Sequence, residues 1–295
     1  MAKDKARCNE IISRVKGGGM IAVYNLENKY KNLALEKVKK FYTDKGEIVV
    51  DYLPLNNELY GKVYVSSMFN FTPKPFIESN FIVGGTGFDL TTKLPTEIEA
   101  AKPKLNFGFT TRGCIRKCKF CVVPQKEGEL VAVGDIYDIW DGRAKEITLL
   151  DNNILGLPKH AEKILKQIKK ENLRLSENGL DVRLLDDGNC KLLSDIRHEE
   201  YKLAWDGDDD LTAKFEYVFD KLGQCRVYVL CGILPFERIM QKLEVLKAIG
   251  HNAYVMRLDN VRSDKLYISL SRWVNQARFF KAITFEQFTQ LRANI

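Results

Sequence analysis

The sequence predicts an α/β fold in which a small parallel α/β domain precedes a partial barrel of six strand–helix units. Two observations support this prediction. Short apolar segments typical of buried strands alternate with amphipathic segments of helical periodicity along most of the chain. In addition, 295 residues with 45% hydrophobic and 11% aromatic side chains are enough for a sizeable core, in one large domain or two modest ones.

The first part of the chain is expected to hold a short arm over residues 1–18 and a small α/β domain with its linker over residues 19–105. The expected elements are a strand, a helix and three further strands, at 20–24, 33–42, 47–52, 62–67 and 80–83. This order favours a parallel sheet. The last strand runs into the glycine-rich turn 84–87, which could bind phosphate through its backbone N–H groups. Because no G-x-G-x-x-G opens a helix there, a tight turn is the favoured interpretation.

From residue 106 onward the pattern repeats a strand, a loop and a helix, which predicts the partial barrel over residues 106–265 and closing helices over residues 266–295. The expected strands are 107–111, 146–150, 174–184, 202–205, 226–230 and 253–258. The expected helices between them include 160–171, 190–196, 211–222 and 236–249. In barrels of this kind the chemistry takes place at the carboxyl ends of the strands, so the residues that follow each strand are the first functional candidates.

Composition narrows the class of protein. No apolar run approaches the ~18 residues that a membrane span needs, and the segment MAKDKARCNE is charged with no apolar signal core behind it. The seven cysteines show no disulfide-framework spacing, so we expect a cytoplasmic protein without membrane association. A net charge of +7 could attract nucleic acid or acidic metabolites, yet much of it lies in helix-like segments such as 163–170. A nucleic-acid substrate therefore stays open.

The segment 107–128, FGFTTRGCIRKCKFCVVPQKEG, is the feature around which the chain is organised. It places Cys114, Cys118 and Cys121 in the spacing C-x3-C-x2-C, and thiolates bunched this tightly are typical ligands of a metal or an iron–sulfur cluster. Three thiolates hold a [4Fe–4S] cubane and leave one iron open for an exogenous ligand. A structural zinc site would need a fourth Cys or His at close spacing, and none is present.

The same segment resembles the cysteine motif of the radical S-adenosylmethionine (radical SAM) superfamily. The similarity includes the strand at 107–111 that precedes the motif, the turn Arg112-Gly113 and the aromatic Phe120 before the third cysteine. It implies a partial TIM-like barrel and a [4Fe–4S] cluster held by the three cysteines. It also implies S-adenosyl-L-methionine as cosubstrate and an electron donor such as flavodoxin or ferredoxin. The implied reaction is reductive cleavage to a 5′-deoxyadenosyl radical, which abstracts hydrogen from a substrate that the sequence does not identify.

The resemblance directs attention to polar residues at the strand ends. Asp151, Asn152 and Asn153 stand where the family carries a Gly-Gly-Glu motif that contacts the methionine amino group; the alternative is an Asx turn. Arg183 is expected to pair with a carboxylate, either that of the bound cosubstrate or that of Asp181 in a buried ion pair.

Two further strand ends supply the remaining candidates. Asp206 follows the fourth strand, where the resemblance implies contact with the ribose hydroxyls. After the fifth strand, Gly232 belongs to a segment similar to the family's adenine-packing region, where glycine permits close approach of the base. Cys231 precedes it and could donate a hydrogen atom in catalysis; the alternative is a small buried hydrophobic residue.

The small α/β domain, Rossmann- or flavodoxin-like, resembles the cobalamin-binding-type domain of one branch of the superfamily. That domain supplies a histidine to cobalt, whereas the first histidine here is His160. We therefore expect the domain to be vestigial or structural, and no cobalamin to bind.

Two alternatives from other functional classes stay open. One is a non-catalytic iron–sulfur protein that senses redox state or carries electrons, which needs the cysteines but not the polar strand ends. The other is a zinc-bearing nucleic-acid module. Metal analysis distinguishes them, since an iron–sulfide protein is brown and a zinc protein is colourless.

Overall fold

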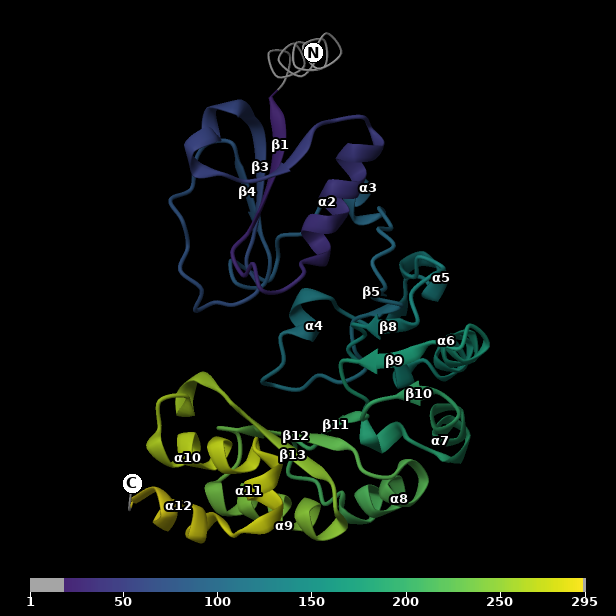
Figure 1. Ribbon diagram of the computed structural model, residues 1–295, viewed down its shortest axis with the longest axis vertical. Helices are drawn as coiled ribbons and strands as arrows, with labels where there is room; N and C mark the ends of the chain where they lie inside the picture. The colour runs from purple at the N-terminus through teal and green to yellow at the C-terminus, as the bar shows by residue number, and fades with distance from the viewer. Residues whose placement is uncertain (1–18, 294–295) are drawn as a thin grey trace. The chain divides into compact units, whose positions relative to one another are not determined.

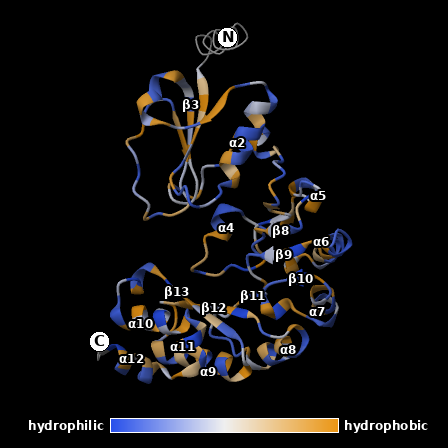
Figure 2. Cartoon of the chain, viewed as in Figure 1, coloured by the Kyte–Doolittle hydropathy of each residue, from blue (hydrophilic) through white to orange (hydrophobic). Residues whose placement is uncertain are grey.

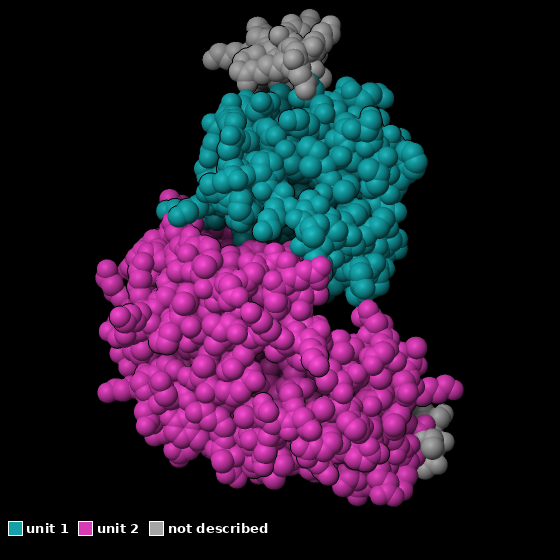
Figure 3. Space-filling model, turned by 180° about the vertical axis from the view of Figure 1, so that it is seen from behind, with its two compact units in different colours: residues 1–104 teal, residues 105–295 magenta. Residues whose placement is uncertain are grey.

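The computed structural model describes residues 19–293. The chain divides after Lys104 into two compact units, shown in teal and magenta in Figure 3, and each is described here by itself. The division falls within one residue of the expected end of the small α/β domain. The expected arm, residues 1–18, lies outside the described residues.

Unit 1 is built on a parallel four-stranded sheet in the order β2-β1-β3-β4 (Figure 1). Its elements are β1 (Met20–Asn25), α2 (Leu33–Asp44), β2 (Val49–Asp51), η1 (Pro54–Leu59), β3 (Tyr60–Ser66), β4 (Phe81–Gly84) and α3 (Thr96–Glu99). All four expected strands and the expected helix are confirmed. Alternation along the central strand places Ile21 and Val23 in one cluster with Val38 of α2, and Ala22 in a second cluster on the opposite face.

The glycine-rich turn after β4 packs tightly against the end of β3. Gly85 has φ +96°, and a Cβ atom at this position would come within 2.3 Å of the Ser67 carbonyl oxygen. The Gly87 N–H donates to the same oxygen at 2.8 Å. The turn thus uses its glycines for close backbone contact, in agreement with the tight-turn interpretation.

Unit 2 contains strands, helices and short 3₁₀ turns in regular succession. Its strands are β5 (Phe107–Gly108), β6 (Thr111–Arg112), β7 (Val131–Ala132), β8 (Glu146–Leu149), β9 (Arg174–Glu177), β10 (Arg197–His198), β11 (Lys202–Ala204), β12 (Arg226–Cys231) and β13 (Asn252–Arg257). Its helices are α4 (Val123–Lys126), α5 (Ile136–Ile139), α6 (Pro158–Lys170), α7 (Asp187–Ser194), α8 (Thr212–Leu222), α9 (Phe236–Ile249), α10 (Lys265–Val274), α11 (Ala277–Ala282) and α12 (Phe285–Ala293). The 3₁₀ turns are η2 (Ile154–Gly156), η3 (Val182–Leu184) and η4 (Asp259–Val261).

The long strands of unit 2 form two parallel sheets, β10-β9-β8-β5 and β11-β12-β13, which a parallel bridge between Leu180 and Leu203 joins. The helices α6, α7, α8 and α9 lie along one side of these strands (Figure 1). On β13, Val255 is buried whereas Tyr254 and Met256 are exposed, so the face opposite the helices is open. The mixed α/β class with parallel sheets is confirmed; curvature of six strands into a partial TIM-like barrel stays a prediction.

One hydrophobic cluster extends through all of unit 2. It joins Ile147 of β8 and Val227 of β12 to Trp273 of α10 and Phe280 of α11. The expected closing helices therefore share the core of the strands. Figure 2 shows apolar residues along the strands, while α6 is largely hydrophilic outside its buried stripe of Ala161, Ile164, Leu165 and Ile168.

Two predicted strands were wrong in length. The strand expected at 174–184 ends at Glu177, because Gly179 has φ +150° and Asp181 caps the short turn η3. The strand expected at 107–111 also stops early, since Thr111 turns into the antiparallel β6–β7 hairpin. The polar density after Glu177 thus belongs to a turn and not to a buried strand.

No helix in residues 19–293 combines the length and apolar composition that a membrane-spanning segment requires.

Candidate functional site

The three motif cysteines lie on one loop between β6 and α4. Cys114, Cys118 and Cys121 are all unpaired thiols and partly exposed. The loop begins at Gly113, whose φ of +82° and contact with the Glu129 backbone exclude a side chain. The Cys121 N–H donates to the Cys118 carbonyl at 3.0 Å, which turns the second half of the loop back on itself.

The thiols influence one another electrostatically. Burial raises the pKa of Cys118, and the charges of Cys121 and Cys114 raise it further, whereas Arg183 lowers it. Cys118 therefore lies within electrostatic range of both other cysteines. Within residues 19–293, no three His, Cys, Asp or Glu side chains already stand close enough together to hold a metal ion.

Cys114 already has the hydrogen bonds that suit a thiolate ligand. Its Sγ accepts from the Arg116 N–H at 3.3 Å and from Asn153 Nδ2 at 3.7 Å. N–H donors to cysteine sulfur are a usual feature of iron–sulfur ligation and tune the cluster's potential.

Glu127, at the end of α4, fastens the two ends of the loop. Its carboxylate accepts from the Gly113 N–H at 3.0 Å, pairs with Arg112 at 3.0 Å and accepts from Asn152 Nδ2 at 2.7 Å. Asn152 is thereby committed to the loop. The sequence analysis missed Glu127, and the one local signal for it is its place between the short helix and Gly128.

Asp151 is buried, and its carboxylate is surrounded by donors of its own chain. Oδ1 accepts from the Thr110 hydroxyl at 2.8 Å, from the Thr111 hydroxyl at 2.5 Å and from the Thr111 N–H. These bonds fix the backbone that leads into the cysteine loop. Asp151 thus holds the loop in position through Thr110 and Thr111, and its expected contact with the methionine ammonium stays a prediction.

Asn153 is the member of the triplet whose side chain contacts a motif cysteine. The side chain is 2% exposed, and Nδ2 donates to Cys114 Sγ at 3.7 Å and to Asp181 Oδ2 at 3.4 Å. Its Oδ1 is buried without a hydrogen-bond partner among the described residues. A buried acceptor of this kind normally accepts a hydrogen bond, so a bound ligand with a donor group would satisfy Asn153 Oδ1.

Arg183 forms the ion pair with Asp181 that was one of its two expected interactions. Its Nε donates to Asp181 Oδ1 at 2.8 Å, and Arg116 Nε donates to Asp181 Oδ2 at 2.9 Å. Burial would raise the pKa of Asp181, but hydrogen bonds from Arg183 and Arg116 lower it below the ordinary value. Asp181 and Arg116 are functional candidates that the sequence motif did not reveal.

Asp206 stands at the end of β11, within electrostatic range of Cys118. The Leu230 N–H donates to its Oδ1 at 3.1 Å, and burial raises the pKa of the carboxyl. Lys242 lies beneath it, bonded to the Trp205 carbonyl at 3.2 Å and to the Gly207 carbonyl. The expected contact of Asp206 with the ribose hydroxyls stays a prediction.

Gly232 and Cys231 have structural explanations. Gly232 has φ +107°, and a Cβ there would come within 2.4 Å of Asn260 Oδ1, so the glycine makes room for Asn260. Cys231 is fully buried in the main hydrophobic cluster, and burial raises its pKa to about 12. This burial agrees with the packing alternative for Cys231, and a catalytic role stays a prediction.

No family model matches the chain, and no curated protein matches it.

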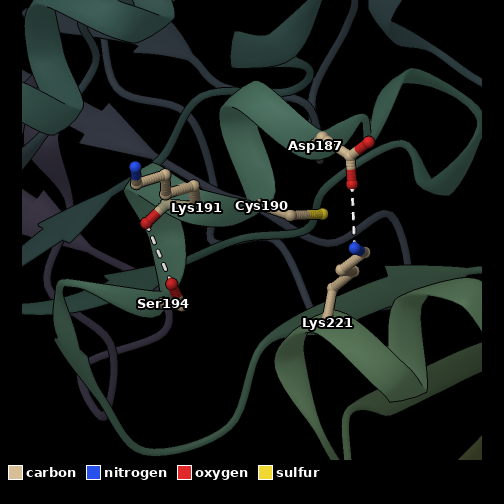
Figure 4. A pocket seen from close by; sticks show the side chains of 5 residues that line it. All are labelled: Asp187, Cys190, Lys191, Ser194 and Lys221. Atoms are coloured by element: carbon tan, nitrogen blue, oxygen red, sulfur yellow. Dashed lines mark hydrogen bonds and ion pairs between the residues drawn. The ribbon is translucent and has the colours of Figure 1, made fainter.

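A separate hollow of about 330 Å³ lies between α7 and α8, away from the cysteine loop in the sequence. Figure 4 shows Asp187 paired with Lys221, at 3.0 Å, and Cys190 pointing toward this pair. Ser194 Oγ donates to the Lys191 carbonyl at 2.9 Å. None of the candidate site residues lines this hollow.

Proposed function

We propose that the protein is a radical SAM enzyme whose cysteine loop binds a [4Fe–4S] cluster. The observation that carries the proposal is the orphaned Asn153 Oδ1 beside Cys114, in a loop that presents only three thiols. Three soft thiolates suit a cluster with an open iron. A buried acceptor next to them suits the ammonium of a bound amino acid.

Each residue has a distinct part in this proposal. Cys114, Cys118 and Cys121 would hold the cluster, which when bound would pass one electron from the donor to S-adenosyl-L-methionine, whose C5′–S bond breaks to give methionine and a 5′-deoxyadenosyl radical. Asn153 would orient the methionine ammonium, and the carboxylate of Asp206 would accept hydrogen bonds from the ribose hydroxyls. The remaining polar groups fix the loop and shape the site before the cosubstrate enters.

The surroundings of the loop are consistent with this assignment. Parallel strands run in chain order from β5 through β8 and β9 to β13, an order that supports the proposal of a partial TIM-like barrel. We propose a reducing, cytoplasmic location, an electron donor such as flavodoxin or ferredoxin, and no cobalamin in unit 1. The substrate is unidentified, with nucleic acid retained as a candidate because of the net charge of +7.

The test is anaerobic reconstitution with iron and sulfide, followed by dithionite and S-adenosyl-L-methionine, with 5′-deoxyadenosine measured by mass spectrometry. The control variants are Cys118→Ala, which loses a ligand, and Cys190→Ala, which removes a buried thiol outside the loop. Deoxyadenosine from wild type and Cys190→Ala, but not from Cys118→Ala, is the expected result.

Other results would assign the protein elsewhere. A brown, loaded protein that gives no deoxyadenosine, even with cell extract as a source of substrate, would contradict radical chemistry and indicate an electron carrier or sensor. A colourless protein that retains zinc would indicate the zinc module.

A further inference from the structure

We propose that Asp181 is a positioning residue: its carboxylate holds the cysteine loop in place through Arg116 and orients Arg183 and Asn153 next to it. This inference rests on the proposed function for its catalytic meaning, but its structural part concerns the chain without any cofactor.

Asp181 joins three segments that are far apart in the sequence. Its side chain is 7% exposed and accepts from Arg116 Nε at 2.9 Å, within the cysteine loop. It also accepts from Asn153 Nδ2 at 3.4 Å, at the end of β8. Its own segment contributes Arg183, whose Nε lies 2.8 Å from Oδ1. One buried carboxylate therefore connects the loop to two strand ends.

The connection determines where positive charge lies relative to the thiols. Arg116 stands between Cys114 and Cys118 in the chain, and the charge of Arg183 is felt by Cys118. Arg183 Nη1 also lies 3.8 Å from Asp209 Oδ2, so the two guanidinium groups face two carboxylates, and Asp181 is the one that both contact.

The same carboxylate orients the group that would contact the cosubstrate. Asn153 Nδ2 donates to Asp181, so the amide plane is held with Oδ1 buried and unpaired. Loss of Asp181 would free the amide to rotate and free Arg116 to leave the site. Outer groups that orient ligands typically contribute 10–100-fold to metal affinity or activity.

The first test uses the full chain without cofactor. The Arg116 side chain is held by Asp181, which should slow trypsin cleavage after Arg116, whereas the exposed Lys93 in a loop of unit 1 serves as internal reference. In Asp181→Asn and Asp181→Ala, cleavage after Arg116 relative to Lys93 should rise about tenfold, as expected for loss of a charged hydrogen bond. Asp187→Asn, which removes a carboxylate from an exposed ion pair on α7, should leave the ratio unchanged. An unchanged ratio in both Asp181 variants would overturn the proposal.

The second test uses the reconstituted protein. Asp181→Asn should bind iron, show a cluster midpoint potential more positive than wild type, and need about tenfold more S-adenosyl-L-methionine to change the spectrum of the reduced cluster. The potential rises because a negative charge near the cluster has been removed. A potential and a half-saturating concentration equal to those of wild type would contradict the positioning role.

The two tests also separate this inference from the proposed function. If wild-type protein binds no cluster, the proposed function fails, and the trypsin ratio still decides whether Asp181 holds the loop. If wild type binds the cluster and the variants match it in every readout, the function stands and the inference fails.

Discussion

A buried glutamate stands at the carboxyl end of a parallel strand in each unit, and the two glutamates differ in their hydrogen bonding and in the direction of their pKa shift. In unit 1, buried Glu27 follows β1 and accepts from Ser67 Oγ at 2.8 Å and the Met68 N–H at 3.0 Å. Burial would raise its pKa, but these bonds and one from Thr72 lower it below the ordinary value. In unit 2, Glu177 ends β9, and its Oε1 accepts from the Lys202 N–H at 2.7 Å. Its buried Oε2 has no hydrogen-bond partner in the described part of the chain, and burial raises the pKa of the carboxyl to about 7.

This difference indicates that the carboxyl ends of the strands have a structural role in unit 1 and form the binding edge in unit 2. Crevices outside the carboxyl ends of parallel strands are common ligand sites. In unit 1, the Glu27 carboxylate at this edge accepts from donors of its own chain. In unit 2, Asn153 Oδ1 has no hydrogen-bond partner within residues 19–293, and its Nδ2 contacts the free thiol of Cys114. The unmet groups and the cysteines therefore locate the candidate site in unit 2.

The largest expected effect is loss of the cluster. Cys118→Ala should lower bound iron and sulfide after reconstitution at least tenfold, because two thiolates do not hold a cubane. Cys190→Ala, which removes a buried thiol of α7, should bind as much iron as wild type. Equal iron in both variants would mean that the binding edge has been misplaced.

A second prediction concerns Glu177. The carboxyl of Glu177 has a pKa of 4.5 in the unfolded chain and of about 7 in the folded chain. Between these two pH values the unfolded chain is ionised while the folded chain is still protonated. The contribution of Glu177 to the free energy of unfolding therefore falls by about 3 kcal/mol as the pH rises through this range. Glu177→Gln should remove this loss, as urea unfolding at pH 5 and pH 8 will show. The exposed Glu216→Gln variant should retain the wild-type dependence on pH; if Glu177→Gln retains it too, the account of this edge is wrong.

Glu27 should show the opposite dependence on pH. Glu27→Ala leaves the Ser67 and Met68 donors unsatisfied and should destabilise the protein by about 2 kcal/mol at pH 7. Since the folded pKa of Glu27 is lowered, its contribution is present above the ordinary glutamate pKa and is lost as the pH falls through the folded value. Unfolding of Glu27→Ala at pH 7 and pH 3, with exposed Glu58→Ala as control, measures the difference. If Glu27→Ala destabilises the protein more at pH 3 than at pH 7, the contrast between Glu27 and Glu177 is wrong.

The smallest effect on stability is expected at Asn153. Asn153→Ala removes two long hydrogen bonds but also an unsatisfied acceptor, so stability should change by less than about 1 kcal/mol. The same variant should need about tenfold more S-adenosyl-L-methionine to perturb the reduced cluster. A loss of several kcal/mol with normal cosubstrate response would show that Asn153 is structural.

Periodicity allowed most of the fold to be predicted. The helix expected at 236–249 has the same bounds as α9, and the burial of alternate residues in β12 follows its apolar pattern. The strand expected at 174–184 was too long because polar residues after Glu177 were taken as strand. Positive φ at Gly179 ends the strand, and a sequence does not show which glycine adopts it.

The cysteine loop could be located from the sequence, but not the contacts that hold it. Asp151, Asn152 and Asn153 are consecutive, yet their side chains go to Thr110 and Thr111, to Glu127 and to Cys114. Asp181 lies 65 residues from Arg116 in the chain. Local pattern identifies the end of a strand, whereas the allocation of neighbouring side chains depends on segments that only the fold brings together.

The most direct test of the central claim is the electron paramagnetic resonance spectrum of the reduced, reconstituted protein before and after addition of S-adenosyl-L-methionine. A cluster on three thiolates has an open iron, so the cosubstrate should change the spectrum of wild type. It should do so more weakly in Asn153→Ala. A loaded and reduced cluster whose spectrum is the same with and without S-adenosyl-L-methionine would contradict the assignment of this loop as a radical SAM site.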